Sequence, residues 1–285
     1  MIEEIVNVEE KRPPVRSSSA HSRELGAELR LARRRTGMSS GQTAEAMEWS
    51  LGKLSKLETG SRGTSVVDIA TLLGRYGTDR ATRERIVAVA AESDTGSFLR
   101  RHDGAPDELV ALSVHESIAR TVTAYEPVVV PALLQTEDYA LALTGSAETA
   151  QARMRRQRQM RRPESTFYVH EVALQLPVGT PQVMHEQMLH LILVSGWHDT
   201  RVRVVPRTRA LHPALRLPAT LLTFEDPVTP VVYVETDAAT VFHDDRPIVE
   251  AYREKLRRLD RLALGVEESR AVLARWATVH ERQAA

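Results

Sequence analysis

Apolar side chains recur every three or four positions through the first third of the chain, which is the spacing of amphipathic helices. Over residues 22–37 they are Leu25, Leu29 and Ala32, and the pattern ends at Gly37. Four more segments of helical character follow, over residues 40–47, 50–59, 65–77 and 79–92. Together they predict a compact five-helix unit of about seventy residues, within the usual size of a domain.

The third of these segments, EWSLGKLSKLETGSR over residues 48–62, has both ends marked. Ser50 is a suitable N-cap, because its hydroxyl can accept a backbone N–H of the first turn, and Gly60 suits a left-handed C-cap. Leu54 and Leu57 predict the inward face. The outward face is small, hydroxylic and cationic, with Gly52, Lys53, Ser55 and Lys56. A short helix and a tight turn precede this segment, which predicts a helix-turn-helix whose outward face suits a phosphate backbone and water equally well.

After residue 105, alternating apolar positions predict β-strands between helical segments. Strands are predicted over residues 166–174, 200–206, 219–226, 231–237 and 239–244. Helices are predicted over residues 106–119, 136–145, 148–160 and 180–197. The last strands follow one another closely, which favours an antiparallel meander. Two further helices close the chain and are predicted to form an α-hairpin hinged at Gly265.

The predicted fold is therefore multidomain: an N-terminal all-α five-helix helix-turn-helix bundle, then an α+β domain with a largely antiparallel sheet and a C-terminal α-hairpin. The predicted boundaries are 1–20 for a flexible arm, 21–95 for the bundle, 96–105 for a linker and 106–285 for the α+β domain. The arm contains a Pro pair and a Ser run, which resist helix and strand. Its Lys11, Arg12 and Arg16 suit either an arm in a DNA minor groove or a solvated tail, which is the commoner case.

The composition is that of an ordinary globular protein: 42% of the 285 residues are hydrophobic and 27% are charged. The chain has no Cys, which excludes disulfides and thiolate zinc sites. It has no run of about eighteen apolar residues, the length that a membrane span requires. Its first residues, MIEEIVNVEEKRPP, lack the basic start and apolar core of a signal peptide. These features predict a cytoplasmic protein with no membrane partner.

The charges cancel over the whole chain, because 38 basic residues balance 38 acidic residues. A neutral total argues against a cationic surface over the whole protein but allows a local patch. Residues 21–63 hold eight Lys or Arg and five acidic residues, a net charge of +3 (8 − 5). The predicted bundle therefore carries a local excess of positive charge.

The bundle resembles the lambda-repressor/Cro-like (Xre-type) DNA-binding domains through LRLARRRTGMSS, AEAMEWSLGKLSKLETGSR and SVVDIATLLGRYG. The resemblance places Ala44 at the contact between the second and third helices, and Glu58 and Gly60 at the end of the third. Beyond the bundle, AYEPVVVPALLQTEDYA, LPVGTPQVMHEQMLHL and ATLLTFEDPVTPVVYVE are similar to the actinobacterial WhiJ-like regulators. That similarity implies a regulator whose C-terminal domain has a poorly understood role. Such proteins are often encoded beside a small acidic partner, and some are described as antitoxin-like.

Several positions depart from the Xre pattern. Ser40 stands where a phosphate-binding Gln is usual, and Glu48 replaces the Gly of the turn. Leu51 and Gly52 occupy outward positions that are often polar amides. Leu51 can contact a thymine methyl group, but Gly52 offers no side chain to a base edge. These departures leave base recognition mainly to one residue, Lys56.

We therefore expect Lys56 to read bases, while Lys53, Ser50 and Ser55 lie near phosphates. The residues predicted to contact DNA are Ser40, Gln42, Ser50, Leu51, Gly52, Lys53, Ser55, Lys56 and Arg62. Since a single helix with so few polar side chains gives limited specificity, dimerisation and DNA shape are expected to contribute.

The remaining groups of charged and polar residues give weaker evidence for a functional site. Six arginines over residues 153–162 predict a solvated helix, or else a second surface for DNA or an acidic partner. His185 and His190 are five positions apart, about 140° around a helix, so they are interpreted as surface residues rather than zinc ligands. Five polar residues suggest either a ligand site or hydrogen-bonded structural groups, and the structural role is commoner. These five are Tyr125, Glu126, Gln135, Glu171 and Glu235.

The sequence thus predicts a dimeric, sequence-specific DNA-binding regulator that is not an enzyme and has no cofactor or metal. Its predicted partners are double-stranded DNA and a second copy of the chain, with a small acidic protein or a small-molecule effector acting through the C-terminal domain. The alternative is an antitoxin-like interaction protein that sequesters a small partner and has weak or vestigial DNA binding. Ser40, Leu51 and Gly52 favour this alternative.

Overall fold

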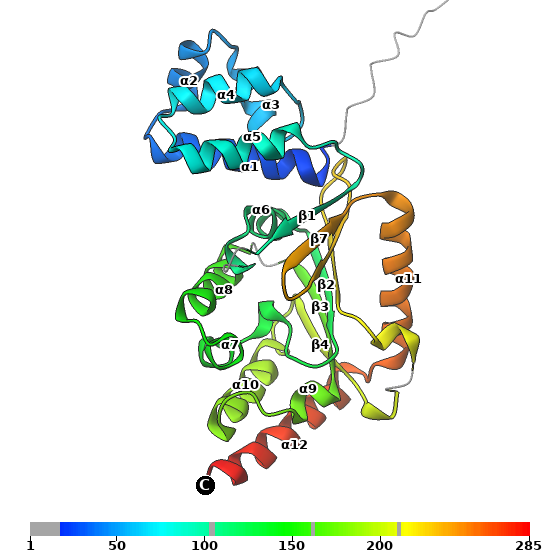
Figure 1. Ribbon diagram of the computed structural model, residues 1–285. Helices are drawn as coiled ribbons and strands as arrows, with labels where there is room; N and C mark the ends of the chain where they lie inside the picture. Colours follow the sequence, from blue (N-terminus) through cyan, green and yellow to red (C-terminus); the bar gives the residue numbers. More distant parts are fainter. Residues whose placement is uncertain (1–17, 103–105, 161–162, 210–211) are drawn as a thin grey trace, which may run out of the picture.

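Five helices form the first structural unit of the computed structural model, which describes residues 18–102, 106–160, 163–209 and 212–285 (Figure 1). They are α1 (Ala20–Arg35), α2 (Ser40–Ala46), α3 (Leu51–Glu58), α4 (Val66–Arg75) and α5 (Arg80–Ala91). Each helix follows a residue whose side chain accepts a backbone N–H of the first turn: Ser19, Ser39, Ser50, Ser65 and Asp79. Such a bond satisfies one of the N–H groups that a helix leaves unpaired at its start. The five predicted helices are confirmed.

One apolar core holds this unit together. Leu29, Leu57, Ile69, Leu72 and Ile86, which come from four of the five helices, are each at most 3% exposed. Burying a Leu or Ile side chain contributes about 1.5–3 kcal/mol, so these contacts fix how α3 lies against α1, α4 and α5.

The second unit is built on one mixed sheet of seven strands in the order β1-β7-β6-β5-β2-β3-β4. The strands are β1 (Ser97–Arg101), β2 (Thr121–Glu126), β3 (Glu164–His170), β4 (Thr200–Val205), β5 (Ala219–Thr223), β6 (Val231–Glu235) and β7 (Ala239–His243). Strands β2, β3 and β4 pair in parallel, and the other four pairings are antiparallel. The predicted meander is confirmed by β5, β6 and β7.

Helices cover both faces of this sheet (Figure 1). They are α6 (Val110–Ile118), α7 (Glu137–Thr144), α8 (Ala147–Gln159), α9 (Glu171–Gln175), α10 (Pro181–Val194), α11 (Arg246–Leu262) and α12 (Val266–Ala284). The described residues of this unit also form four short 3₁₀ turns in its connections: η1 (Pro106–Glu108), η2 (Ala132–Leu134), η3 (Arg207–Arg209) and η4 (Pro213–Leu215). Alternate strand residues point to opposite faces, so Phe167 belongs to the core beneath α6, α7, α10 and α12, whereas Tyr168 belongs to the core beneath α11.

The two closing helices are present, with the predicted break at Gly265, but they do not pack as a hairpin. Val249, Leu256 and Leu259 of α11 belong to one core, and Leu273 and Ala277 of α12 belong to the core on the opposite face of the sheet. The apolar stripes of both helices are satisfied by the sheet and by α10, which removes the need for contact between α11 and α12.

Three other predictions need correction. Residues 97–101 of the predicted linker form β1, because Phe98 stacks on Phe242 of β7 and so finds an apolar partner. Residues 171–174, predicted as the end of a strand, belong to α9, which begins where His170 accepts the N–H of Val172. The end of the predicted arm is packed, since Ala20 opens α1 and is fully buried. Lys11, Arg12 and Arg16 lie outside the described residues.

The start of α1 joins the helical unit to the sheet. The Ala20 N–H donates to Asp244 Oδ2 at 2.6 Å, and Glu24 Oε2 lies 2.6 Å from Arg100 Nη2 of β1. Arg23 is buried, with its guanidinium 4.9 Å from the centre of the Phe224 ring. Helix α1 also packs on α6. Among the described residues, no helix has the length and apolarity that a membrane span requires.

Candidate nucleic-acid interface

The turn between α2 and α3 is tight and contains one strained residue. The N–H of Trp49 donates to the carbonyl of Ala44 at 2.8 Å, which closes the turn over the buried Ala44 side chain. Glu48 has φ 55°, in the left-handed region that favours Gly. In the Xre pattern this position is usually Gly, so the chain forms the turn with a residue for which this conformation is unfavourable.

Close contact between α1 and the end of α3 holds the third helix in place. A Cβ at Gly26 would lie 2.6 Å from the Leu57 carbonyl oxygen, and one at Gly60 would lie 2.6 Å from the backbone of Ser22. The Glu58 carboxylate is buried and accepts two hydrogen bonds from Arg33, at 2.6 and 2.9 Å. Two glycines and a buried ion pair therefore lock α3 onto α1.

The outward face of α3 is open to solvent in the full chain. Leu54, Leu57 and Glu58 point inward, while Leu51, Gly52, Ser55 and Lys56 are exposed. Leu51 is the largest apolar side chain of this face and is 58% exposed. The Lys56 side chain forms no hydrogen bond or ion pair with any residue that the structure describes. Its ammonium group is thus free to bind an anion.

Lys53 has partners within the protein. Its Nζ lies 3.7 Å from the centre of the Trp49 ring and 3.6 Å from Asp68 Oδ2 of α4. Thr64 donates a hydrogen bond to the same carboxylate, and this bond, with a smaller effect of Lys53, lowers the pKa of Asp68. A cation–π contact and an ion pair hold the charge of Lys53 close to the protein. Neither partner of Lys53 was predicted from the sequence.

The other predicted contact residues include two whose side chains cap helices and two that are exposed. Ser50 Oγ accepts the N–H of Lys53 at 3.1 Å, and Gln42 Oε1 accepts the N–H of Ser39 at 2.8 Å, so both side chains cap helices. Ser40 is the exposed first residue of α2. Arg62 is exposed in the loop after α3, and its side chain has no partner within the described ranges.

The arginine-rich helix α8 is only partly solvated, contrary to the sequence-based interpretation. Arg156 is buried and donates to both oxygens of Glu116, at 2.6 and 3.0 Å, and to Asp107. Arg153 is also buried and donates to Asp107 at 2.7 Å. Burial alone would lower the pKa of Arg156, but the Glu116 carboxylate outweighs it and holds the pKa well above its usual range. Helix α8 therefore directs two of its cations into the protein rather than toward a nucleic acid.

The five polar residues considered as a ligand site do not all converge. Tyr125 points to the α11 face and donates to the Leu215 carbonyl at 3.1 Å, and Glu171 pairs with Arg275 at 2.7 Å. Gln135, Glu126 and Glu235 lie near Arg153. Burial, reinforced by the nearby Glu235 carboxylate, raises the pKa of Glu126 to about 8. His190, interpreted as a surface residue, is half-buried, and burial lowers its pKa.

Two family models match the chain. A model described as a helix-turn-helix domain matches residues 24–86, from α1 to α5. A model described as a domain of unknown function, DUF5753, matches residues 109–275, from the start of α6 into α12. No curated protein and no solved structure matches the chain.

Proposed function

Since the chain belongs to the DUF5753 family and carries a helix-turn-helix domain ahead of the family's domain, we propose that it is a sequence-specific, DNA-binding transcription regulator. The helix-turn-helix domain itself suggests a DNA-binding regulator. The single observation that carries the proposal is the outward face of α3, which stays exposed in the full chain and presents the unpaired Lys56 among small side chains. An α-helix with such a face fits a DNA major groove.

The proposed roles follow from the geometry of each side chain. Lys56 donates to base edges, for which guanine O6 and N7 are suitable acceptors, while Leu51 contacts thymine methyl groups. Ser55 and Arg62 contact phosphates, together with Ser40 and Gln42 at the start of α2. Lys53 contributes mainly charge, because Trp49 and Asp68 hold its ammonium group.

The regulator is proposed to act as a homodimer of Xre type, similar to the WhiJ-like regulators, in the cytoplasm. Two α3 helices about 34 Å apart would enter successive major grooves. Control through the C-terminal domain, by a small partner protein or a ligand, is supported by the packing of α1 on α6. A partner can shift the dimer between arrangements only if it binds one of them better.

The second candidate is an antitoxin-like interaction protein with weak DNA binding. The ion pair between Lys53 and Asp68 favours it, since this contact removes one of the two α3 cations from full engagement with DNA. Gly52 also offers no side chain to a base. Under this alternative, a small protein co-purifies with the chain and operator affinity is weak.

The test is a titration of the full-length protein with DNA from upstream of its own gene and with a scrambled duplex, across a salt series. We expect the native site to bind at least about 10³-fold more tightly. Lys56→Ala should reduce the free-energy difference between native and scrambled binding by about 1–3 kcal/mol, because it removes a base contact. Lys53→Ala should instead reduce the salt slope by less than about 1, because Asp68 already engages its ammonium group, with little change in the ratio.

The matched control is Arg83→Ala, which removes an exposed cation from α5 in the same domain. It should leave both the ratio and the salt slope unchanged. Equal binding of both duplexes, or no binding to either, would contradict the proposal and favour the partner-sequestering alternative.

A further inference from the structure

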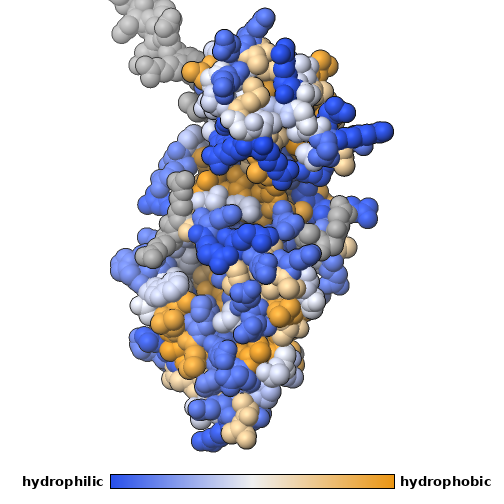
Figure 2. All heavy atoms as spheres, turned by 90° about the vertical axis from the view of Figure 1, so that its left-hand side faces the viewer, coloured by the Kyte–Doolittle hydropathy of each residue, from blue (hydrophilic) through white to orange (hydrophobic). Residues whose placement is uncertain are grey.

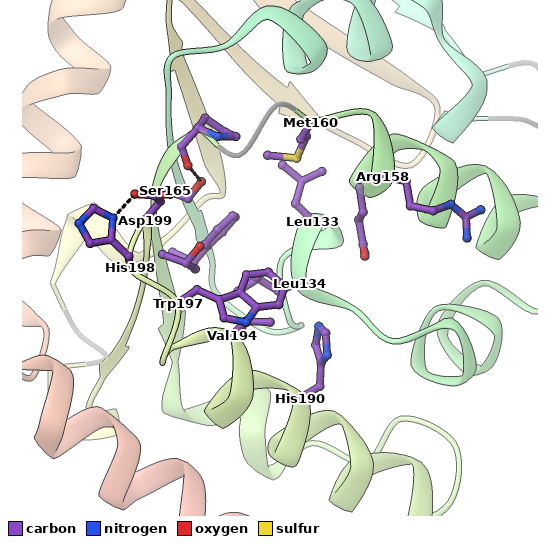
Figure 3. Close-up of a pocket in the computed structure, with 14 residues that line it drawn as sticks. Leu133, Leu134, Arg158, Met160, Ser165, His190, Val194, Trp197, His198 and Asp199 are labelled. Carbon is purple, nitrogen blue, oxygen red and sulfur yellow. Dashed lines mark hydrogen bonds and ion pairs between the residues drawn. The ribbon is translucent and has the colours of Figure 1, made fainter.

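A cavity of about 580 Å³ lies in the second unit, between η2, the end of α8, the start of β3 and the end of α10 (Figure 3). Its volume is within the range of small-molecule sites, about 300–1,000 Å³. It is separate from the outward face of α3 and from the buried charge cluster of Arg153 and Arg156, neither of which lines it. The cavity therefore has no role in the interface described above.

One wall of the cavity is apolar and aromatic. Figure 3 shows Leu133, Met160, Val194 and Trp197 grouped around the hollow. Trp197 is 58% exposed, although its indole is the largest apolar group of this wall. Aromatic rings prefer offset-stacked or edge-on contact with another ring. An indole left open at a cavity of this size is suited to a planar ligand.

The polar part of the lining is not negatively charged overall. Asp199 is its acidic residue, and it is paired with the neighbouring His198. His190 enters from α10 without a hydrogen-bond partner in the described part of the chain. Its neutral imidazole has one donor and one acceptor available. Apart from Asp199, whose carboxylate already contacts the His198 ring, the described residues of the polar lining include no acidic residue.

Arg158 supplies the positive charge at the rim. The other arginines of α8 in the described ranges, Arg153, Arg155 and Arg156, pair with Asp107, Glu108 and Glu116 respectively. Arg158 has no partner among the described residues. Its guanidinium points away from the hollow in Figure 3, so contact with a ligand at the cavity mouth requires rotation of this exposed, flexible side chain. A guanidinium binds carboxylates through two parallel hydrogen bonds.

We propose that this cavity binds a small, planar, largely apolar molecule with one anionic group, of the aromatic carboxylate class. The ring lies against Trp197 and Leu133, and the carboxylate faces Arg158. This proposal goes beyond the proposed function and does not depend on it, because the site is distant from α3 and can be tested in the absence of DNA.

The experiment is calorimetric titration of the full-length protein with 2-naphthoate, with its charge-reversed analogue 2-naphthylmethylammonium, and with the non-planar anion decanoate. We expect one saturable site for 2-naphthoate and weaker binding of both analogues. Trp197→Ala should weaken 2-naphthoate binding about ten-fold, by removing the aromatic contact. Arg158→Gln should weaken it about five-fold and remove the preference for the carboxylate over the ammonium.

Two matched controls separate this site from general surface binding. Leu193→Ala removes a 64%-exposed apolar side chain from α10 that does not line the cavity. Arg155→Gln makes the same charge change as Arg158→Gln on the same helix. Both controls should bind 2-naphthoate within about two-fold of the parent protein, as surface changes away from a site usually do. Absence of saturable binding, or equal losses in controls and site variants, would overturn the proposal.

Discussion

Helices α3 and α8 both carry several polar and cationic side chains, yet they direct their charges in opposite ways. On α3, Lys56 stands on an exposed face without a partner among the described residues. On α8, Arg156 is 1% exposed and lies between the carboxylates of Asp107 and Glu116. The number of cations in a run of sequence therefore does not predict the charge that a helix presents. What decides is whether carboxylates from other elements meet the cations. Figure 2 shows hydrophilic and hydrophobic residues mixed over one face of both units, without a separate hydrophilic surface along one of them.

The largest test of this comparison is to remove the buried charge from α8. Arg156→Met keeps most of the side-chain volume but leaves Glu116 buried without its cation and Asp107 paired with Arg153 alone. We expect a loss of about 3–5 kcal/mol in the free energy of unfolding, measured by urea denaturation. Arg155→Met is the control on the same helix, since its exposed pair with Glu108 should contribute about 0–1 kcal/mol. Equal losses in the two variants would show that Arg156 is not structural.

The carboxylate of Glu126 extends the comparison of α3 with α8. It lies near Arg153 of α8, yet its pKa is raised rather than lowered. Burial first, and Glu235 second, raise its pKa to about 8 in the folded protein, against 4.5 as the ordinary value. Between these two values the unfolded chain loses a proton that the folded protein keeps, so stability falls as pH rises from about 4.5 to about 8.

Glu126→Gln removes this penalty. Its stability gain over the parent protein should therefore be larger at pH 8 than at pH 5, by roughly 1–3 kcal/mol in urea denaturation. Glu164→Gln, on an exposed residue of β3, is the control and should show no such dependence on pH. A gain that is the same at both pH values would mean that Glu126 is ionised in the folded protein.

Local patterns explain why the helices of the first unit could be predicted. Each begins at a Ser or Asp cap and repeats its apolar residues at helical spacing, and both signals lie within a few positions. Strand β1 was missed because it is short and partly exposed, with Phe98 as its main apolar contact to Phe242. Strand β2 was not predicted either, although Val122 and Ala124 bury one face of it.

The same contrast holds for the candidate DNA interface. The outward face of α3 follows from helical spacing alone, so its exposed residues could be identified from the sequence. The partners of Lys53 could not, because Asp68 meets it only after α4 packs on the bundle. The burial of Arg156 likewise depends on Glu116, forty residues away in sequence. Pairing between distant elements leaves no periodic signal in the chain.

A smaller effect is expected when Lys53 is released. Asp68→Asn removes the negative charge beside its ammonium group and keeps the side chain at the start of α4. DNA affinity at low salt should then rise about three- to ten-fold, with a salt slope steeper by less than about 1, because the Lys53 ammonium group becomes fully available to phosphates. Glu84→Gln makes the same charge change on α5 and should have little effect. Unchanged affinity of Asp68→Asn would mean that Lys53 does not face the DNA.

The smallest expected effect concerns the turn that precedes α3. Glu48 has φ 55°, and a left-handed conformation costs a residue with a side chain roughly 1–2 kcal/mol, whereas Gly adopts it freely. The greater freedom of Gly in the unfolded chain offsets about 0.5–1 kcal/mol of this relief. Glu48→Gly should therefore stabilise the protein by about 0.5–1 kcal/mol in thermal or urea unfolding. Glu45→Gly, three positions earlier within α2, should instead destabilise it by about 1 kcal/mol, since a helical residue gains nothing from left-handed freedom. The two substitutions remove the same side chain, so opposite signs would isolate backbone strain as the cause, and a loss in both would show that the turn holds Glu48 by contacts of its side chain.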